Sequence, residues 1–165
     1  RVVAYGRHAN IEETGAYYRK IQLKKAYICD RPIKQMEGAK YIEWNLKKFK
    51  KNVLKHDLVV IVHARNFREK FKDVGRSMVA MALGLPVVAT TNIETRRVLK
   101  KAGHSELIMK KPTDLRKIVR RLQSYEVRKK IGDDLHAYAW ANWRPDITSK
   151  YMADVFEKVI GKRGI

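Results

Sequence analysis

The segment from Val74 to Asn92, VGRSMVAMALGLPVVATTN, constrains the fold more than any other part of the chain. Gly84 is suited to end a helix and Pro86 cannot continue one, so the segment predicts a helix, a tight turn and a strand. The strand residues Val87 to Ala89 are all apolar, which is typical of a strand buried on both faces. These features predict half of an α/β unit that belongs to a parallel sheet.

Helices and strands alternate along the rest of the chain in the same way. The predicted strands run from Val2 to Tyr5, Ala26 to Cys29, Lys40 to Glu43, Leu58 to Val62, Val87 to Ala89 and Glu106 to Met109. The predicted helices cover Ala16 to Gln22, Leu46 to Leu54, a helix opening at Gly75, Glu94 to Ala102, and the chain from Pro112 onward with a break at Asn142 to Pro145. This alternation predicts an α/β fold, a Rossmann-like parallel sheet of about six strands with helices on both faces and a C-terminal helical tail.

Composition narrows the class of protein. At 165 residues with 45% hydrophobic content, the chain is long and apolar enough for one domain, and we expect residues 1 to 165 to form it. The single Cys29 excludes an internal disulfide and favours a reduced environment. No apolar run approaches the roughly 20 residues that span a bilayer, and no signal peptide opens the chain. We therefore expect a cytoplasmic protein.

The charge predicts an anionic partner. Lys and Arg number 37 against 17 Asp and Glu, which gives a net charge of +20. Lysines occupy the outer face of the helix from Leu46 to Leu54, and the outer face of a later helix carries Arg116, Lys117, Arg120 and Arg121. Phosphorylated ligands, nucleic acid and an anionic membrane surface all remain candidates, and the last would place the protein at the membrane periphery. No RNA-recognition, zinc-finger or basic-zipper signature supports nucleic acid.

Ligands of open parallel sheets bind beyond the carboxyl ends of the strands, so the residues there are the candidate site. Arg7, Arg65 and Arg76, with the helix start at Gly75 and the hydroxyl of Ser77, form a set that could neutralise a diphosphate. Alternatively, Gly75 only permits a turn and Arg76 is solvated.

His63 also follows a strand, and either contacts a ligand or is a half-buried strand-end histidine. The other histidines have no spacing that suggests metal ligation, so no metal site is predicted.

The segment described first resembles the donor-binding half of retaining GT-B glycosyltransferases of the group 1 type. Three parts of the chain carry the resemblance, and it spans nearly the whole sequence. The matching residues are Ala80, Met81, Ala82, Gly84, Pro86, Val87 and Val88 in the helix and turn, Val3, Ala4, Tyr5, Gly6 and Arg7 in the opening strand and Gly-Arg loop, and Asp114, Leu115, Arg128, Gly132 and Trp140 in the tail. The chain has Val79 where the family has a Glu used on the ribose of the donor.

The resemblance implies that a nucleotide diphosphate sugar is the donor substrate, with no further cofactor and no metal in the core mechanism. Gly6, Arg7, Gly75 and Arg76 would stabilise the diphosphate leaving group electrostatically. It also implies that Trp44 flanks the base and Glu94 approaches the sugar. No catalytic side chain is assigned.

The family has an acceptor domain before the donor domain. Because the chain begins at Arg1 without a Met, we expect it to be the C-terminal half of a longer protein.

Two hypotheses therefore stand. The chain is the donor domain of a glycosyltransferase, or it is a non-catalytic Rossmann-like binding protein that uses its basic surface for nucleic acid or an anionic membrane. The sugar, nucleotide base and acceptor are not determined by the sequence.

Overall fold

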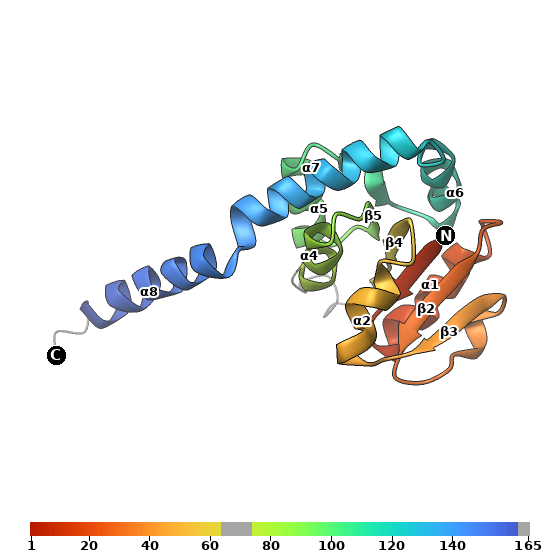
Figure 1. The fold of residues 1–165 in the computed structure, drawn as a ribbon, viewed down its shortest axis with the longest axis horizontal. Helices are drawn as coiled ribbons and strands as arrows, with labels where there is room; N and C mark the ends of the chain where they lie inside the picture. The colour runs from red at the N-terminus through yellow and green to blue at the C-terminus, as the bar shows by residue number, and fades with distance from the viewer. Residues whose placement is uncertain (64–73, 162–165) are drawn as a thin grey trace.

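The computed structural model describes residues 1–63 and 74–161, so Arg65 of the predicted site lies outside the described residues. The described chain forms one six-stranded sheet, in which all neighbouring strands run parallel and helices flank the sheet (Figure 1). The strands are β1 Val2–Tyr5, β2 Lys25–Cys29, β3 Ala39–Glu43, β4 Leu58–Ile61, β5 Val87–Thr90 and β6 Ile108–Met109. Their order is β3-β2-β1-β4-β5-β6, which confirms the predicted fold class.

Helices connect these strands and continue beyond the sheet. They are α1 His8–Tyr18, α2 Leu46–Val53, α4 Gly75–Ala82, α5 Ile93–Lys101, α6 Pro112–Arg121, α7 Tyr125–Trp143 and α8 Pro145–Gly161, with short 3-10 helices η1 Lys34–Met36 and η2 Ser105–Leu107. The strand order reverses between β1 and β4, and such a switch point opens a crevice at the carboxyl edge of the sheet.

The core explains why the central strands carry almost only Val, Ala and Ile. Every residue of β1, β4 and β5 is buried, because helices cover both faces of the sheet. The buried side chains of strands and helices form one hydrophobic cluster. The edge strand β3 is only partly buried.

The predicted helix from Ala16 to Gln22 is wrong in position, because α1 spans His8–Tyr18. Its buried side includes Asn10, Thr14 and Gly15, so the helix lacks the apolar periodicity on which the prediction depended. Gly15 allows a close approach, since a Cβ there would lie 2.3 Å from the Gln35 carbonyl oxygen. The predicted last strand is also shortened, because its first two residues belong to η2.

The two C-terminal helices differ in position, because α7 packs on the sheet domain and α8 extends away from it (Figure 1). α7 packs against α4, and a Cβ on Gly132 would lie 2.3 Å from the Gly84 carbonyl oxygen. His136 Nδ1 donates to the Ala82 carbonyl at 2.9 Å. Arg144 then adopts an extended conformation before Pro145, which separates α7 from α8 as predicted. α8 extends away from the body of the molecule (Figure 1).

Candidate functional site

The candidate site lies where β1, β4 and the start of α4 meet at the carboxyl edge of the sheet. Arg76, half-buried near the start of α4, donates to the Val62 carbonyl through Nη1 and Nη2, both at 3.4 Å. Its Nη2 also approaches His63 Nδ1 at 3.2 Å. The guanidinium therefore crosses from α4 to the carboxyl end of β4.

Gly6 brings the end of β1 against the same guanidinium. A Cβ at Gly6 would lie 2.9 Å from Arg76 Nη1, and the φ of +149° is one that residues with side chains rarely adopt. Position 6 therefore favours glycine mainly through its backbone conformation, because the Arg76 guanidinium ends a flexible side chain that can shift away from a Cβ. The sequence placed Gly6 and Arg76 in one site, and the structure brings them into contact.

Tyr5 fixes the backbone of the same helix turn. Its hydroxyl donates to the Arg76 carbonyl at 2.7 Å. Burial raises the pKa of the Tyr5 phenol well above its ordinary value, although Arg76 opposes part of this rise. The phenol therefore stays protonated and keeps its donor role at neutral pH.

His63 is buried directly after β4 and joins β5 to the site. Its backbone N–H donates to Thr90 Oγ1 at 2.8 Å, and its ring Nε2 lies 3.4 Å from Asn92 Nδ2. Asn92 uses Oδ1 to cap α5 by accepting from the Thr95 N–H at 2.7 Å. Arg76 Nη2 faces Nδ1 of the His63 ring and Asn92 Nδ2 faces Nε2, so both of these contacts are with N–H donors. We call Gly6, His63, Arg76 and Asn92 the switch-point cluster.

Gly75 and Ser77 lie at the beginning of α4, beside the switch-point cluster. The start of a helix carries partial positive charge from its backbone dipoles, which favours an anion. The Ser77 side chain is 1% exposed, and its Oγ has no hydrogen-bond partner in the described part of the chain. The five predicted residues Gly6, His63, Gly75, Arg76 and Ser77 thus converge on one region.

The remaining predicted residues within the described chain lie further out. Arg7 precedes α1 and is exposed, without a side-chain bond that caps this helix. Glu94, in the first turn of α5, accepts two bonds from Arg97, at 3.0 Å from Nε and 2.7 Å from Nη2. These bonds hold the pKa of the Glu94 carboxyl below its ordinary value. Glu94 is therefore a carboxylate already engaged on its own helix.

Trp44 follows β3, two strands away from β1, and is half exposed. Its ring packs against Phe49 with centroids 4.8 Å apart, and Phe49 meets Tyr5 edge to face at 5.0 Å. A row of three aromatic rings therefore connects Trp44 to the residue that holds the start of α4.

Sequence reasoning did not assign Tyr5, Thr90 or Asn92 to the site. Thr90 ends a buried strand and Asn92 follows it, so the sequence indicates that both lie at the carboxyl edge of the sheet. Their contacts with His63 could not be predicted from the sequence. Tyr5 looked like an ordinary strand aromatic, because nothing local indicates that its hydroxyl reaches a residue far along the chain.

Metal ligation and membrane spanning were also considered. Across residues 1–63 and 74–161, no three His, Cys, Asp or Glu side chains group so that they could hold a metal ion. Over the same ranges, no helix has both the length and the apolar character needed to cross a bilayer.

No protein family and no curated protein matches this chain in sequence. Solved structures do match its fold. A mutant of an O-GlcNAc transferase from Thermobaculum terrenum is similar with a TM-score of 0.66 at 15% identity, over 95% of this chain and 35% of that one. A mutant of phage T4 BGT in complex with UDP-glucose is similar with a TM-score of 0.68 at 13% identity, over 95% and 47%.

Both solved structures are GT-B glycosyltransferases, so the chain has the fold of a GT-B domain. It spans about a third to a half of the length of these proteins. At these identities the likeness concerns the fold, and the chemistry of the site has to be argued from its own residues.

Proposed function

We propose that this chain is the donor-binding domain of a retaining GT-B glycosyltransferase of the group 1 type, and that it binds a nucleotide diphosphate sugar at the switch-point cluster. One observation carries the proposal. The Arg76 guanidinium lies across the carboxyl ends of β1 and β4, where Gly6 leaves room for it. Ligands of doubly wound sheets bind at this point.

The chemistry of the cluster suits a diphosphate. Arg76 offers a planar fork of donors and adds to the positive end of α4, and Ser77 and Gly75 add a hydroxyl and backbone groups. As the glycosyl bond breaks, negative charge grows on the diphosphate, and donors fixed in advance stabilise it. Tyr5 serves this purpose by holding the Arg76 backbone in place. This mechanism requires no metal.

The first helix turn of α5 and the ring of Trp44 complete the proposed site. Both Arg97 bonds end on Glu94 Oε2, so Glu94 Oε1 could accept a bond from a sugar hydroxyl while that pair stays intact. Trp44 would flank the nucleotide base from β3. Val79, which stands in place of the family's Glu, is exposed on α4 and offers no group for the ribose.

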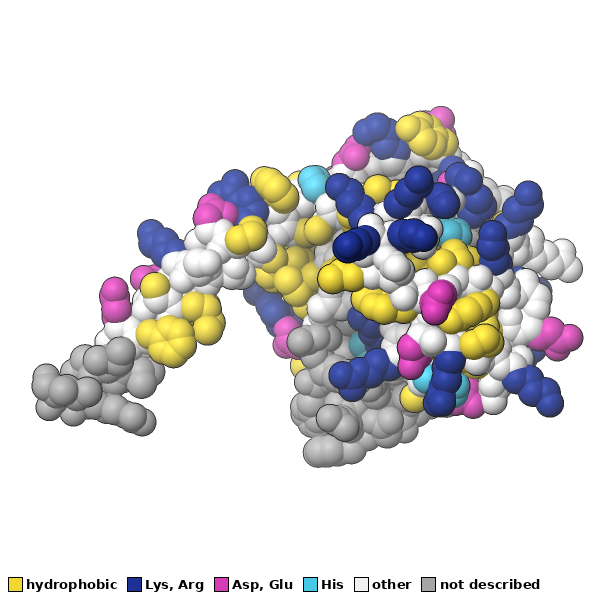
Figure 2. Space-filling model, turned by 60° about the horizontal axis from the view of Figure 1, so that its bottom comes forward, with side chains coloured by type: hydrophobic (Ala, Val, Ile, Leu, Met, Phe, Trp, Pro, Cys, Tyr) yellow, Lys and Arg dark blue, Asp and Glu magenta, His cyan; other side chains and the backbone are white. Residues whose placement is uncertain are grey.

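We also propose that an acceptor domain precedes this one in the complete protein and contacts α8. The side chains from Thr148 to Lys158 are all exposed, and hydrophobic ones gather along one side of the helix (Figure 2). This apolar stripe consists of Tyr151, Met152, Val155 and Phe156. A stripe of this kind on a helix that leaves its own domain fits a second domain.

Calorimetric titration with UDP, GDP, ADP and their glucose conjugates at physiological salt tests the donor site. We expect saturable binding of one nucleotide with a clear preference among bases. Arg76→Ala should weaken this binding by at least about tenfold, since a charge-assisted bond contributes roughly 1.5–3 kcal/mol.

Lys117→Ala is the control, because it removes one positive charge from the exposed face of α6, outside the switch-point cluster. It should leave nucleotide affinity unchanged. If both variants bind nucleotide as the unmodified chain does, the diphosphate is bound elsewhere. If none of the nucleotides binds the unmodified chain, the donor-domain proposal fails.

A further inference from the structure

A second basic region lies between α6 and the segment that follows α1. Here the surface forms a groove of about 550 Å³, which we call the α1–α6 groove. Arg19 and Lys20 line it on one side, and Arg116 and Arg120 line it on the other. Ile21 and Val119, both buried, contribute its apolar lining.

The groove is separate from the switch-point cluster. Lys24, which follows the groove segment, accepts through its carbonyl from the Val2 N–H at the amino end of β1. The segment from Arg19 to Leu23 therefore lies at the amino edge of the sheet, whereas the switch-point cluster lies at the carboxyl edge. A ligand in the groove would not occupy the donor site.

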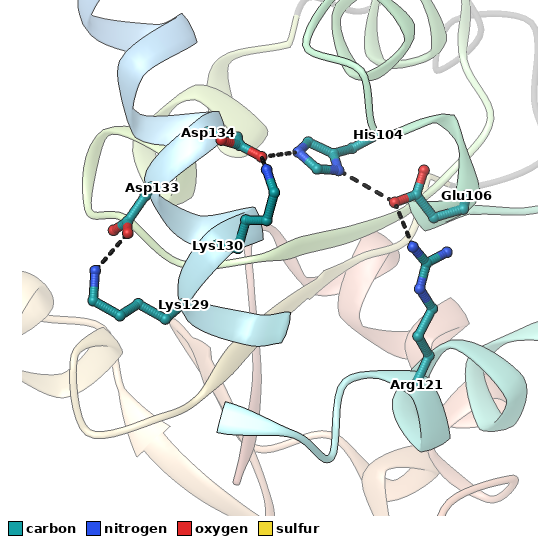
Figure 3. Close-up of polar contacts among 7 residues, drawn as sticks. All are labelled: His104, Glu106, Arg121, Lys129, Lys130, Asp133 and Asp134. Carbon is teal, nitrogen blue, oxygen red and sulfur yellow. Dashed lines mark hydrogen bonds and ion pairs between the residues drawn. The ribbon is translucent and has the colours of Figure 1, made fainter. Parts of the chain in front are cut away.

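Four cations face this groove without a counterion. Within the described residues, Arg19, Lys20, Arg116 and Arg120 form no ion pair, and no Asp or Glu lines the groove. Arg121, on the same helix, does have a counterion, because its Nη2 lies 3.6 Å from Glu106 Oε1 (Figure 3). The face of α6 toward the groove is thus charged without a counterion in the described chain, whereas Arg121 has one.

The arrangement on α6 points to a ligand with repeated charges. Arg116 and Arg120 are one helical turn apart, about 6 Å along the axis, so both point to the same side. Thr113 and Gln123 extend this row with a hydroxyl and an amide. Arginine forks bind phosphate oxygens in pairs, and like charges held close together repel until an anion neutralises them.

The lining also narrows the type of anion. No aromatic residue lines the groove, so bases have no ring to stack on. None of the exposed large hydrophobic residues lines it either, so nothing there would insert into a lipid layer. We propose that the α1–α6 groove binds a chain of phosphate groups, as in polyphosphate or the sugar–phosphate backbone of nucleic acid, without reading bases.

Fluorescence anisotropy with a labelled, base-free oligodeoxynucleotide tests this proposal on the complete chain. Polyphosphate serves as the competitor and as a second direct ligand, so the two sources of phosphate are compared. The double variant Arg116→Ala/Arg120→Ala should bind the probe at least about tenfold more weakly. The slope of log K against log salt should fall by about 1.4, since each phosphate contact on a single strand contributes about 0.7.

Lys47→Ala/Lys50→Ala on α2 is the matched control, because it removes the same charge from another exposed basic surface. It should retain most of the affinity for both phosphate probes. Equal losses in the two double variants would show that only net charge matters and overturn the proposal. Binding to anionic vesicles but to neither phosphate chain would overturn it as well.

Discussion

Two buried histidines of this protein lie in opposite electrical surroundings. His104, at the start of η2, has Nδ1 at 3.2 Å from Glu106 Oε1 and Nε2 at 3.1 Å from Asp134 Oδ2 (Figure 3). His63 instead has the donors Arg76 and Asn92 beside its ring nitrogens. The ring of His104 therefore lies among carboxylate acceptors, whereas the ring of His63 lies among N–H donors.

The difference separates a structural cluster from a candidate binding cluster. Around His104, Lys130 pairs with Asp134 at 2.7 Å and Arg121 pairs with Glu106, so each carboxylate already has a cationic partner besides the His104 ring. These residues tie α7 and α6 to η2, and we call His104, Glu106 and Asp134 the α7 clamp. The switch-point cluster presents donors at the carboxyl edge of the sheet, which is what a diphosphate requires.

The largest expected effect concerns the packing of the helix that the α7 clamp holds. Gly132→Ala places a methyl group 2.3 Å from the Gly84 carbonyl oxygen, and backbone on both sides has to shift. The cost should exceed the gain in helix propensity and lower the free energy of unfolding by about 1–3 kcal/mol. Urea denaturation followed by circular dichroism measures it.

Asp133→Ala, at the next position of α7, is the control, since its side chain is mostly exposed and pairs only with Lys129. It should change stability by less than about 0.5 kcal/mol. If the two variants are equally stable, α7 does not depend on close contact at Gly132.

Exchanging each histidine for glutamine tests the comparison directly. His104→Gln loses two charge-assisted bonds and should cost about 1–2 kcal/mol of stability. His63→Gln should instead weaken nucleotide binding more than it lowers stability. Urea denaturation and calorimetric titration of both variants check this, and the reverse pattern would break the comparison.

A substitution that keeps the charge of Arg76 but removes its guanidinium group tests whether nucleotide binding depends on geometry or on charge alone. Arg76→Lys retains a cation but loses the paired donors that reach Val62 and His63. Nucleotide affinity should fall by about tenfold, or roughly 1.4 kcal/mol, in a calorimetric titration. An unchanged affinity would mean that charge alone, rather than the guanidinium geometry, matters in this cluster.

The smallest expected effect is the acid dependence of the α7 clamp. The Lys130 ammonium and then His104 hold the pKa of the Asp134 carboxyl below its ordinary value, despite some opposing desolvation. A carboxyl with a lower pKa in the folded state stabilises the protein above its unfolded pKa, and this contribution is lost as pH falls through the folded pKa. Asp134 is more than a third exposed, so the contribution is roughly a few tenths of a kcal/mol.

Asp134→Asn should therefore be slightly less stable than the unmodified chain near neutral pH, and the difference should vanish as the pH falls through the lowered pKa of Asp134. Thermal unfolding at several pH values measures this, with Asp133→Asn as the control. A difference that persists in acid would indicate that Asp134 acts through packing rather than charge.

Much of the fold could be predicted from local patterns, and the misses have physical causes. The apolar runs of β4 and β5 and the Gly-Leu-Pro turn identified the parallel sheet. α1 was misplaced because Asn10 and Thr14 are buried on it, and polar residues do not mark a buried face in the sequence. β6 was predicted too long because residues at its start form a 3-10 turn instead.

The sequence by itself determined that strands and helices alternate, that the charge is strongly positive, and which residues follow each strand. Spacing and composition are local properties, so they could be deduced without coordinates. Only the tertiary structure decided which of these residues meet, because the strand order β3-β2-β1-β4-β5-β6 brings Gly6 beside Arg76 and leaves Trp44 two strands away. Contacts between distant segments arise from packing of the whole sheet, which no single stretch of sequence contains.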